Sequence, residues 1–124
     1  MNHELTAEKM AIYRAAAQQR RQQRLEKLVQ RREIGWEVAR QAAELLKTQF
    51  GAIKVVVFGS MLSLERIHER SDLDLAVWGL NPREYYRAVG QLLSLESTIP
   101  VDLVEAEFAK SSLIAAIEQE GVPL

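Results

Sequence analysis

Residues 55–79 read VVVFGSMLSLERIHERSDLDLAVWG, and this stretch decides the fold. Two apolar, β-branched runs flank a Gly-Ser pair and a charged segment, which predicts strands at about 53–58 and 73–78 joined by a turn and a loop. Asp72 and Asp74 interrupt the second apolar run. A buried carboxylate without a partner is unfavourable, and two neighbouring carboxylates also repel each other, so this segment requires a positive counterpart.

The composition indicates one small globular domain. The chain has 124 residues, 48% of them hydrophobic, and it contains no cysteine. The missing cysteines exclude disulfides and thiolate metal sites, and they favour a cytoplasmic protein. No apolar run approaches the ~18 residues that a membrane span requires, so we expect no membrane partner.

The first half of the chain is basic and predicted to be helical. Helical spacing predicts a helix over about 31–49, capped by Gly51, with an apolar face at Ile34, Val38, Ala42, Leu45 and Leu46. Residues 1–30 are a predicted N-terminal extension to a domain at 31–124, because residues 14–24 have almost nothing to bury. This extension is either a solvent-exposed helix or an arm that docks on another chain. It lacks interleaved aromatic residues, so we do not expect direct nucleic-acid binding.

The second half alternates strands and helices. A helix capped by Asn81 follows to about residue 95, a third strand covers 99–106, and a closing helix covers 108–120. The predicted fold class is therefore α/β, more specifically α+β. A small mixed sheet is covered by helices and preceded by a long N-terminal helical segment.

Three aspartates form the first part of a candidate site. Side chains alternate along a strand, so Asp72 and Asp74 are predicted to share one face. Asp102 in the third strand is also an acid among apolar residues. If these two strands are neighbours, three carboxylates gather on one face and can ligate a hard cation such as Mg²⁺.

The Gly-Ser pair forms the second part of this site. Gly59 directly follows the first strand, where a missing side chain permits a tight turn, and Ser60 offers a hydroxyl and a backbone N–H. Together with the aspartates, this turn predicts a nucleoside triphosphate site. Nearby in sequence, His68 is interpreted as a solvated loop residue, and Arg66 and Arg70 either steer phosphates or are simply exposed.

The sequence FGS, eleven further residues, DLD and a later PVDLV resemble the minimal nucleotidyltransferases of the polymerase-β-like superfamily. The resemblance covers about residues 51–106. It implies that Gly59, Ser60 and Ser71 bind ATP, and that Asp72, Asp74 and Asp102 are the catalytic residues and the ligands of two Mg²⁺ ions. The implied reaction is attack of a hydroxyl on the α-phosphorus with release of pyrophosphate.

The resemblance also suggests an acceptor. Small members of this family pair with helical HEPN-type RNase toxins and neutralise them as antitoxins by transferring AMP to a tyrosine. We therefore expect a HEPN-type toxin partner. Two alternatives remain open, namely an adenylyltransferase that modifies a small molecule, and a non-catalytic antitoxin that neutralises its partner by stoichiometric binding.

Overall fold

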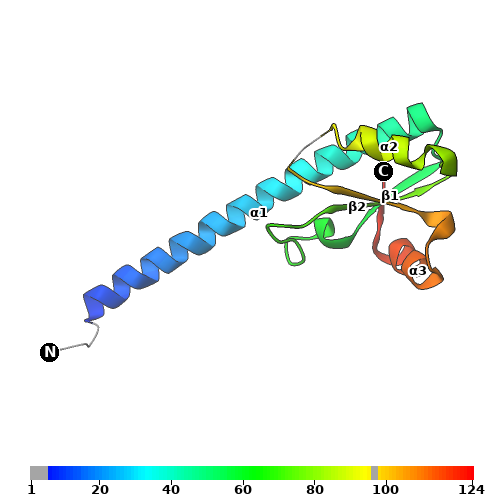
Figure 1. Ribbon diagram of the computed structural model, residues 1–124. Coiled ribbons are helices and arrows are strands. Elements are labelled where there is room, and N and C mark those ends of the chain that lie inside the picture. Colours follow the sequence, from blue (N-terminus) through cyan, green and yellow to red (C-terminus); the bar gives the residue numbers. More distant parts are fainter. Residues whose placement is uncertain (1–5, 96–97) are drawn as a thin grey trace.

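The computed structural model describes residues 6–95 and 98–124. A four-stranded mixed sheet with three helices makes up the body. The N-terminal part of helix α1 (Ala7–Phe50) projects from this body as a long arm, and its C-terminal part belongs to the body (Figure 1). None of the helices in the described residues is long and apolar enough to cross a membrane.

Helix α1 is continuous over 44 residues and has well-formed ends. The Thr6 hydroxyl accepts the backbone N–H of Lys9 at 3.1 Å. Gly51 ends the helix in the left-handed conformation (φ 69°), and its N–H bonds to the Leu46 carbonyl. The predicted Gly51 cap is thus confirmed, and the residues before 31 continue the same helix.

The apolar face of α1 differs in part from the predicted one. The buried residues of α1 are Gly35, Val38, Ala39, Ala42, Ala43, Leu46 and Phe50. The prediction placed Ile34 on this face, but Ile34 is 40% exposed and Gly35 is buried in its place. A Cβ on Gly35 would lie 2.7 Å from the sulfur of Met61, so the missing side chain lets Met61 pack directly onto the helix.

Most of the first 27 residues of the chain form the arm. In α1, Leu28 is the first residue that packs against the hydrophobic core. Before it, Ile12, Tyr13 and Leu25 are 66%, 58% and 47% exposed. A solvent-exposed helical extension was one of the two expected forms. The division at residue 30 falls inside this continuous helix and stays a prediction.

The sheet has the strand order β3-β2-β1-β4. Strands β1 (Lys54–Phe58) and β2 (Leu73–Trp78) are antiparallel, and β3 (Val101–Glu105) runs parallel to β2. The three predicted strands are confirmed, and β2 and β3 are neighbours as the site prediction required. The two-residue strand β4 (Val122–Pro123), which pairs with β1, was not predicted.

Helices cover both faces of the sheet (Figure 1). The end of α1 and α2 (Tyr85–Leu92) pack with Val55, Val57 and the odd-numbered residues of β2. On the opposite face, Ile117 of α3 (Ser111–Glu120) packs with Val56 and Ala76. Alternation along β2 therefore places Asp74 on the α3 side of the sheet.

Short 3₁₀ turns account for the remaining differences from the predicted boundaries. The Asn81 cap is confirmed, because its side chain accepts the Arg83 N–H at 3.0 Å, but the segment begins as the 3₁₀ turn Pro82–Glu84. A second turn, Ala106–Phe108, precedes α3, so this helix begins three residues later than predicted. A third turn, η1 (Gly59–Leu62), directly follows β1.

Candidate active site

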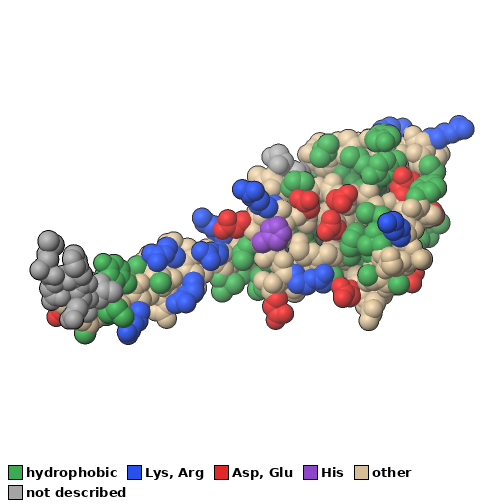
Figure 2. Space-filling model, turned by 60° about the horizontal axis from the view of Figure 1, so that its bottom comes forward, with side chains coloured by type: hydrophobic (Ala, Val, Ile, Leu, Met, Phe, Trp, Pro, Cys, Tyr) green, Lys and Arg blue, Asp and Glu red, His purple; other side chains and the backbone are tan. Residues whose placement is uncertain are grey.

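The predicted aspartates meet where β1 ends and β2 and β3 begin. Asp74 lies opposite Phe58 of β1 and beside Asp102 of β3. Registered positions of neighbouring strands share a face, so the side chains of Asp74 and Asp102 lie on the same side of the sheet. Asp72 is exposed and directly precedes β2. Figure 2 shows acidic side chains gathered on one face of the body.

The carboxylate of Asp74 lies in an unfavourable electrostatic environment. Burial, together with the negative charges of Asp102 and Asp72, raises its pKa from 3.8 to about 6. In the described residues, the ion pairs join Arg40 with Glu37, Arg66 with Glu120, and Arg87 with Glu84. None of these pairs neutralises the three aspartates, so the site holds uncompensated negative charge.

Gly59 is fitted to Asp74 in two ways. Its φ of +80° lies in the left-handed region, which disfavours any side chain. A Cβ at this position would also collide with the carboxylate oxygen Oδ2 of Asp74. The glycine therefore lets the turn after β1 approach the carboxylate of the neighbouring strand. The tight turn predicted at Gly59 is confirmed.

The two predicted serines lie in different environments. Ser60 lies in η1 beside Gly59 and is partly exposed. Ser71 is only 1% exposed, and its hydroxyl accepts the backbone N–H of His68 at 2.8 Å. In this conformation Ser71 uses its hydroxyl within the protein, and it shapes the loop that leads to Asp72.

The comparison with protein families agrees with this geometry. The sequence profile of the family described as polymerase beta nucleotidyltransferase matches residues 40–124, which is more than half of the chain. The chain belongs to this family. The match contains β1, the Gly-Ser turn, β2 and β3, and it begins after the arm. No curated protein matches the sequence.

Solved structures show the same nucleotidyltransferase fold. A proposed minimal nucleotidyltransferase has 30% identical residues and a TM-score of 0.56, and the alignment covers 81% of this chain and 95% of that one. A toxin–antitoxin structure with AMP-PNP has 25% identity and a TM-score of 0.55, with coverages of 65% and 67%. The toxin–antitoxin MntA–HepT has the same fold at 21% identity and a TM-score of 0.53, with coverages of 71% and 69%.

Helix α1 holds the Gly-Ser turn of the nucleotidyltransferase domain through side-chain donors. The carbonyl of Met61 accepts hydrogen bonds from Nε of Arg32 and Nε1 of Trp36, each at 3.0 Å. Nη2 of Arg32 also donates to the Leu62 carbonyl at 2.9 Å. Two carbonyls at the end of η1 are thus fixed to the helix, and η1 begins with Gly59.

A neighbouring arginine holds the segment that carries Asp72 and Asp74. The guanidinium of Arg31 donates to the Ser71 carbonyl from Nη2 at 2.8 Å and from Nε at 3.2 Å. Its Nη1 also donates to the Thr98 carbonyl at 3.4 Å. Because Ser71 precedes Asp72, Arg31 connects α1 to the start of the DLD segment. We call Arg31, Arg32 and Trp36 the α1 clamp.

The sequence analysis did not single out the α1 clamp. These residues lie in a basic stretch that reads as a solvated helix face, and their partners are backbone carbonyls 25 to 67 residues away. A pair of arginines followed four residues later by a tryptophan, next to the apolar stripe, is the one local signal of a buried contact. All three residues also lie outside the family match.

The raised pKa of Asp74 gives a first prediction. In the native state its carboxyl binds a proton below about pH 6, whereas in the unfolded chain it does so only below about 3.8. Stability therefore falls as pH rises from about 4 to about 6, and the penalty persists above that range. In EDTA, Asp74→Asn should raise the unfolding free energy by about 1 to 2 kcal/mol at pH 7.5, after allowance for half exposure, and should change little at pH 4.

Urea denaturation at both pH values measures this effect. The control is Glu118→Gln, which neutralises an exposed carboxylate on α3. A less stable Asp74→Asn variant at pH 7.5 would show that a positive partner already compensates this carboxylate.

The α1 clamp gives a second prediction. Trp36→Phe keeps an aromatic ring and removes the N–H donor to Met61. The hydrogen bond that is lost contributes about 1 kcal/mol. We therefore expect the backbone amides of residues 60–63 to exchange roughly fivefold faster in this variant than in the wild type. Trp78→Phe is the matched control, because Trp78 lies on β2 and stacks with Lys54 instead. Equal exchange in both variants would contradict a role of Trp36 in holding this turn.

Proposed function

We propose that this chain is a magnesium-dependent nucleotidyltransferase antitoxin that transfers AMP from ATP to a tyrosine of a HEPN-type toxin. The observation that carries the proposal is the half-buried Asp74, which is wedged against Gly59 between two further carboxylates. The nucleotidyltransferase family supports the reaction type. The toxin–antitoxin relative with AMP-PNP supports the nucleotide and the kind of partner.

Asp72, Asp74 and Asp102 fit a magnesium site. They offer only oxygen donors, which Mg²⁺ prefers, and burial together with their mutual repulsion raises the pKa of Asp74. The described residues contain no group of three such side chains arranged closely enough to hold a metal by themselves. This agrees with the usual mode of Mg²⁺ binding, in which one or two carboxylates act together with substrate phosphates. When bound, the metal would offset negative charge on the phosphates and on the attacking oxygen.

Residues of the chain would then bind the triphosphate and act on the acceptor hydroxyl. The turn at Gly59 and Ser60 would bind the triphosphate, with the Ser60 hydroxyl as a donor. The acceptor oxygen would form a bond to the α-phosphorus while the bond to pyrophosphate breaks. Asp102 is exposed at the edge of the cluster, and it would take the hydroxyl proton or orient the hydroxyl. The α1 clamp and Ser71 would position these segments.

A binding role without catalysis is the second candidate. It is favoured by the arm, because the exposed apolar and basic residues of α1 can engage a partner without any nucleotide. An antitoxin of this kind would silence its partner stoichiometrically. Modification of a small molecule has no comparable observation in its favour.

One experiment separates these functions. The protein is incubated with ATP, Mg²⁺ and the protein encoded by the adjacent gene, and intact masses of both are measured. Transfer of AMP adds about 329 Da per event, because an adenylyl group replaces a proton. Asp72→Asn with Asp74→Asn should abolish the gain, and the control Glu118→Gln should retain it. An unmodified neighbour that is nevertheless silenced would support the binding role and refute the enzymatic one.

A further inference from the structure

The base of the arm forms a groove beside the candidate active site. A space of about 470 Å³ lies between α1 and the loop before Asp72, lined by Arg24, Leu28, Ile67, His68, Glu69 and Arg70. An adjoining space of about 260 Å³ shares Leu28 and Glu69 and adds Lys27 and Arg31. We call this combined surface, formed by residues 24, 27, 28, 31 and 67–70, the arm-base groove.

The loop wall of the arm-base groove is held in place. Ser71 and His68 exchange two hydrogen bonds, from His68 N–H to the Ser71 hydroxyl at 2.8 Å and from Ser71 N–H to the His68 carbonyl at 3.0 Å. Ile67 is 5% exposed and belongs to the core, and Arg31 fixes the Ser71 carbonyl. The groove is therefore a preformed surface, and its loop leads directly into the catalytic segment.

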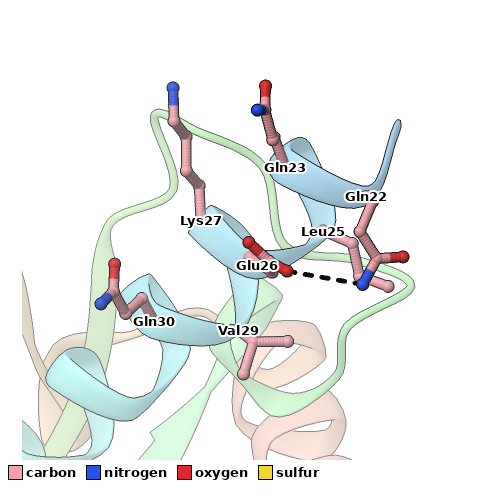
Figure 3. Close-up of a pocket in the computed structure, with 7 residues that line it drawn as sticks. All are labelled: Gln22, Gln23, Leu25, Glu26, Lys27, Val29 and Gln30. Atoms are coloured by element: carbon pink, nitrogen blue, oxygen red, sulfur yellow. Dashed lines mark hydrogen bonds between the residues drawn. The ribbon is translucent and has the colours of Figure 1, made fainter. Parts of the chain in front are cut away.

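A second recess lies on another side of α1, at the same turns of the helix as the groove. A recess of about 590 Å³ is lined by residues between Gln22 and Gln30, where Leu25 and Val29 lie among polar side chains (Figure 3). All of its lining residues come from α1, so it lacks an opposing wall and cannot enclose a small molecule. Leu25 is 47% exposed there. This recess extends the docking area around the helix.

The charges of this surface indicate an acidic ligand. Residues 7–30 carry six basic and two acidic side chains, and Arg70 adds a further positive charge across the groove. Figure 2 shows basic side chains along the arm and acidic ones on the body. An acidic partner would be attracted to the arm and repelled by the uncompensated carboxylates, so it would be guided to the groove between them.

The other side chains favour a polypeptide over a nucleic acid. Leu25, Leu28 and Val29 of the arm, with Ile67 of the loop, supply apolar contact area. Glu26 and Glu69 lie within the same surface and would repel a phosphate backbone. Residues 14–35 contain no aromatic side chain on which a base could stack.

We propose that the arm-base groove is the docking surface for the protein that accepts the nucleotide, and that this protein presents an acidic segment with apolar side chains to it. The proposal rests on the proposed function for the identity of the acceptor. Beyond that function, the proposal specifies where the acceptor binds and which side chains recognise it. Docking there would bring the acceptor beside Asp72, because only Ser71 separates this residue from the groove.

Charge reversal tests the proposal in the full chain. The probe is the protein encoded by the adjacent gene, and its affinity is measured by calorimetry without nucleotide at 50 and 300 mM salt. Arg24→Glu with Arg70→Glu should weaken binding at least tenfold at low salt and should reduce its salt dependence. The matched control is Arg83→Glu with Lys110→Glu, which makes the same charge change at exposed positions outside the groove and should stay within twofold.

Further measurements make each outcome decisive. Melting temperatures show whether the variants are folded, and the milder pair Arg24→Gln with Arg70→Gln gives the result if the reversal disturbs folding. Equal loss in the groove and control variants, or no binding by the wild type, would overturn the proposal. The proposal would also be overturned if the wild type binds a 20-nucleotide RNA tightly, the groove variant loses this RNA binding, and both bind the protein encoded by the adjacent gene with equal affinity. Separate titration of the wild type with ATP and Mg²⁺ tests the proposed function independently.

Discussion

The repulsion among three carboxylates is the constraint on which the rest of the site depends. The register of β1, β2 and β3 brings Asp74 beside Asp102 at the end of the sheet where Gly59 turns the chain. Burial and two like charges raise the pKa of Asp74 to about 6, so the fold maintains a charge that it does not neutralise. A cation that binds together with a ligand would balance this charge. Such a cation accounts for the lack of a basic partner of these aspartates within the described residues.

The sequence predicted the elements whose signals are local. The apolar run LDLAVW, the β-branched run before Gly59 and the Gly51 cap each identified a strand or a helix end that the structure confirms. The predicted gathering of the three carboxylates required β2 and β3 to be neighbours, and the structure shows that they are. The missed features depend on tertiary contact. Strand β4 has only two residues, and Gly35 replaces Ile34 on the buried face because Met61 packs there.

Helix α1 links the arm to the Gly-Ser turn and to the start of the DLD segment. Its clamp residues donate to carbonyls on both sides of the loop between η1 and β2, and the same helix forms one wall of the arm-base groove. The family match begins at residue 40, so the arm and the clamp lie outside the matched region. The proposed docking surface of this helix thus lies beside the candidate active site.

Titration of the protein with ATP by calorimetry tests most directly whether the aspartate cluster is a metal-dependent nucleotide site. The account predicts measurable binding with Mg²⁺ and at least tenfold weaker binding in EDTA, because the triphosphate would then face uncompensated carboxylates. Asp74→Asn, which removes one of these charges, should reduce the difference between the two conditions. Equal affinity of the wild type with Mg²⁺ and in EDTA would contradict the account.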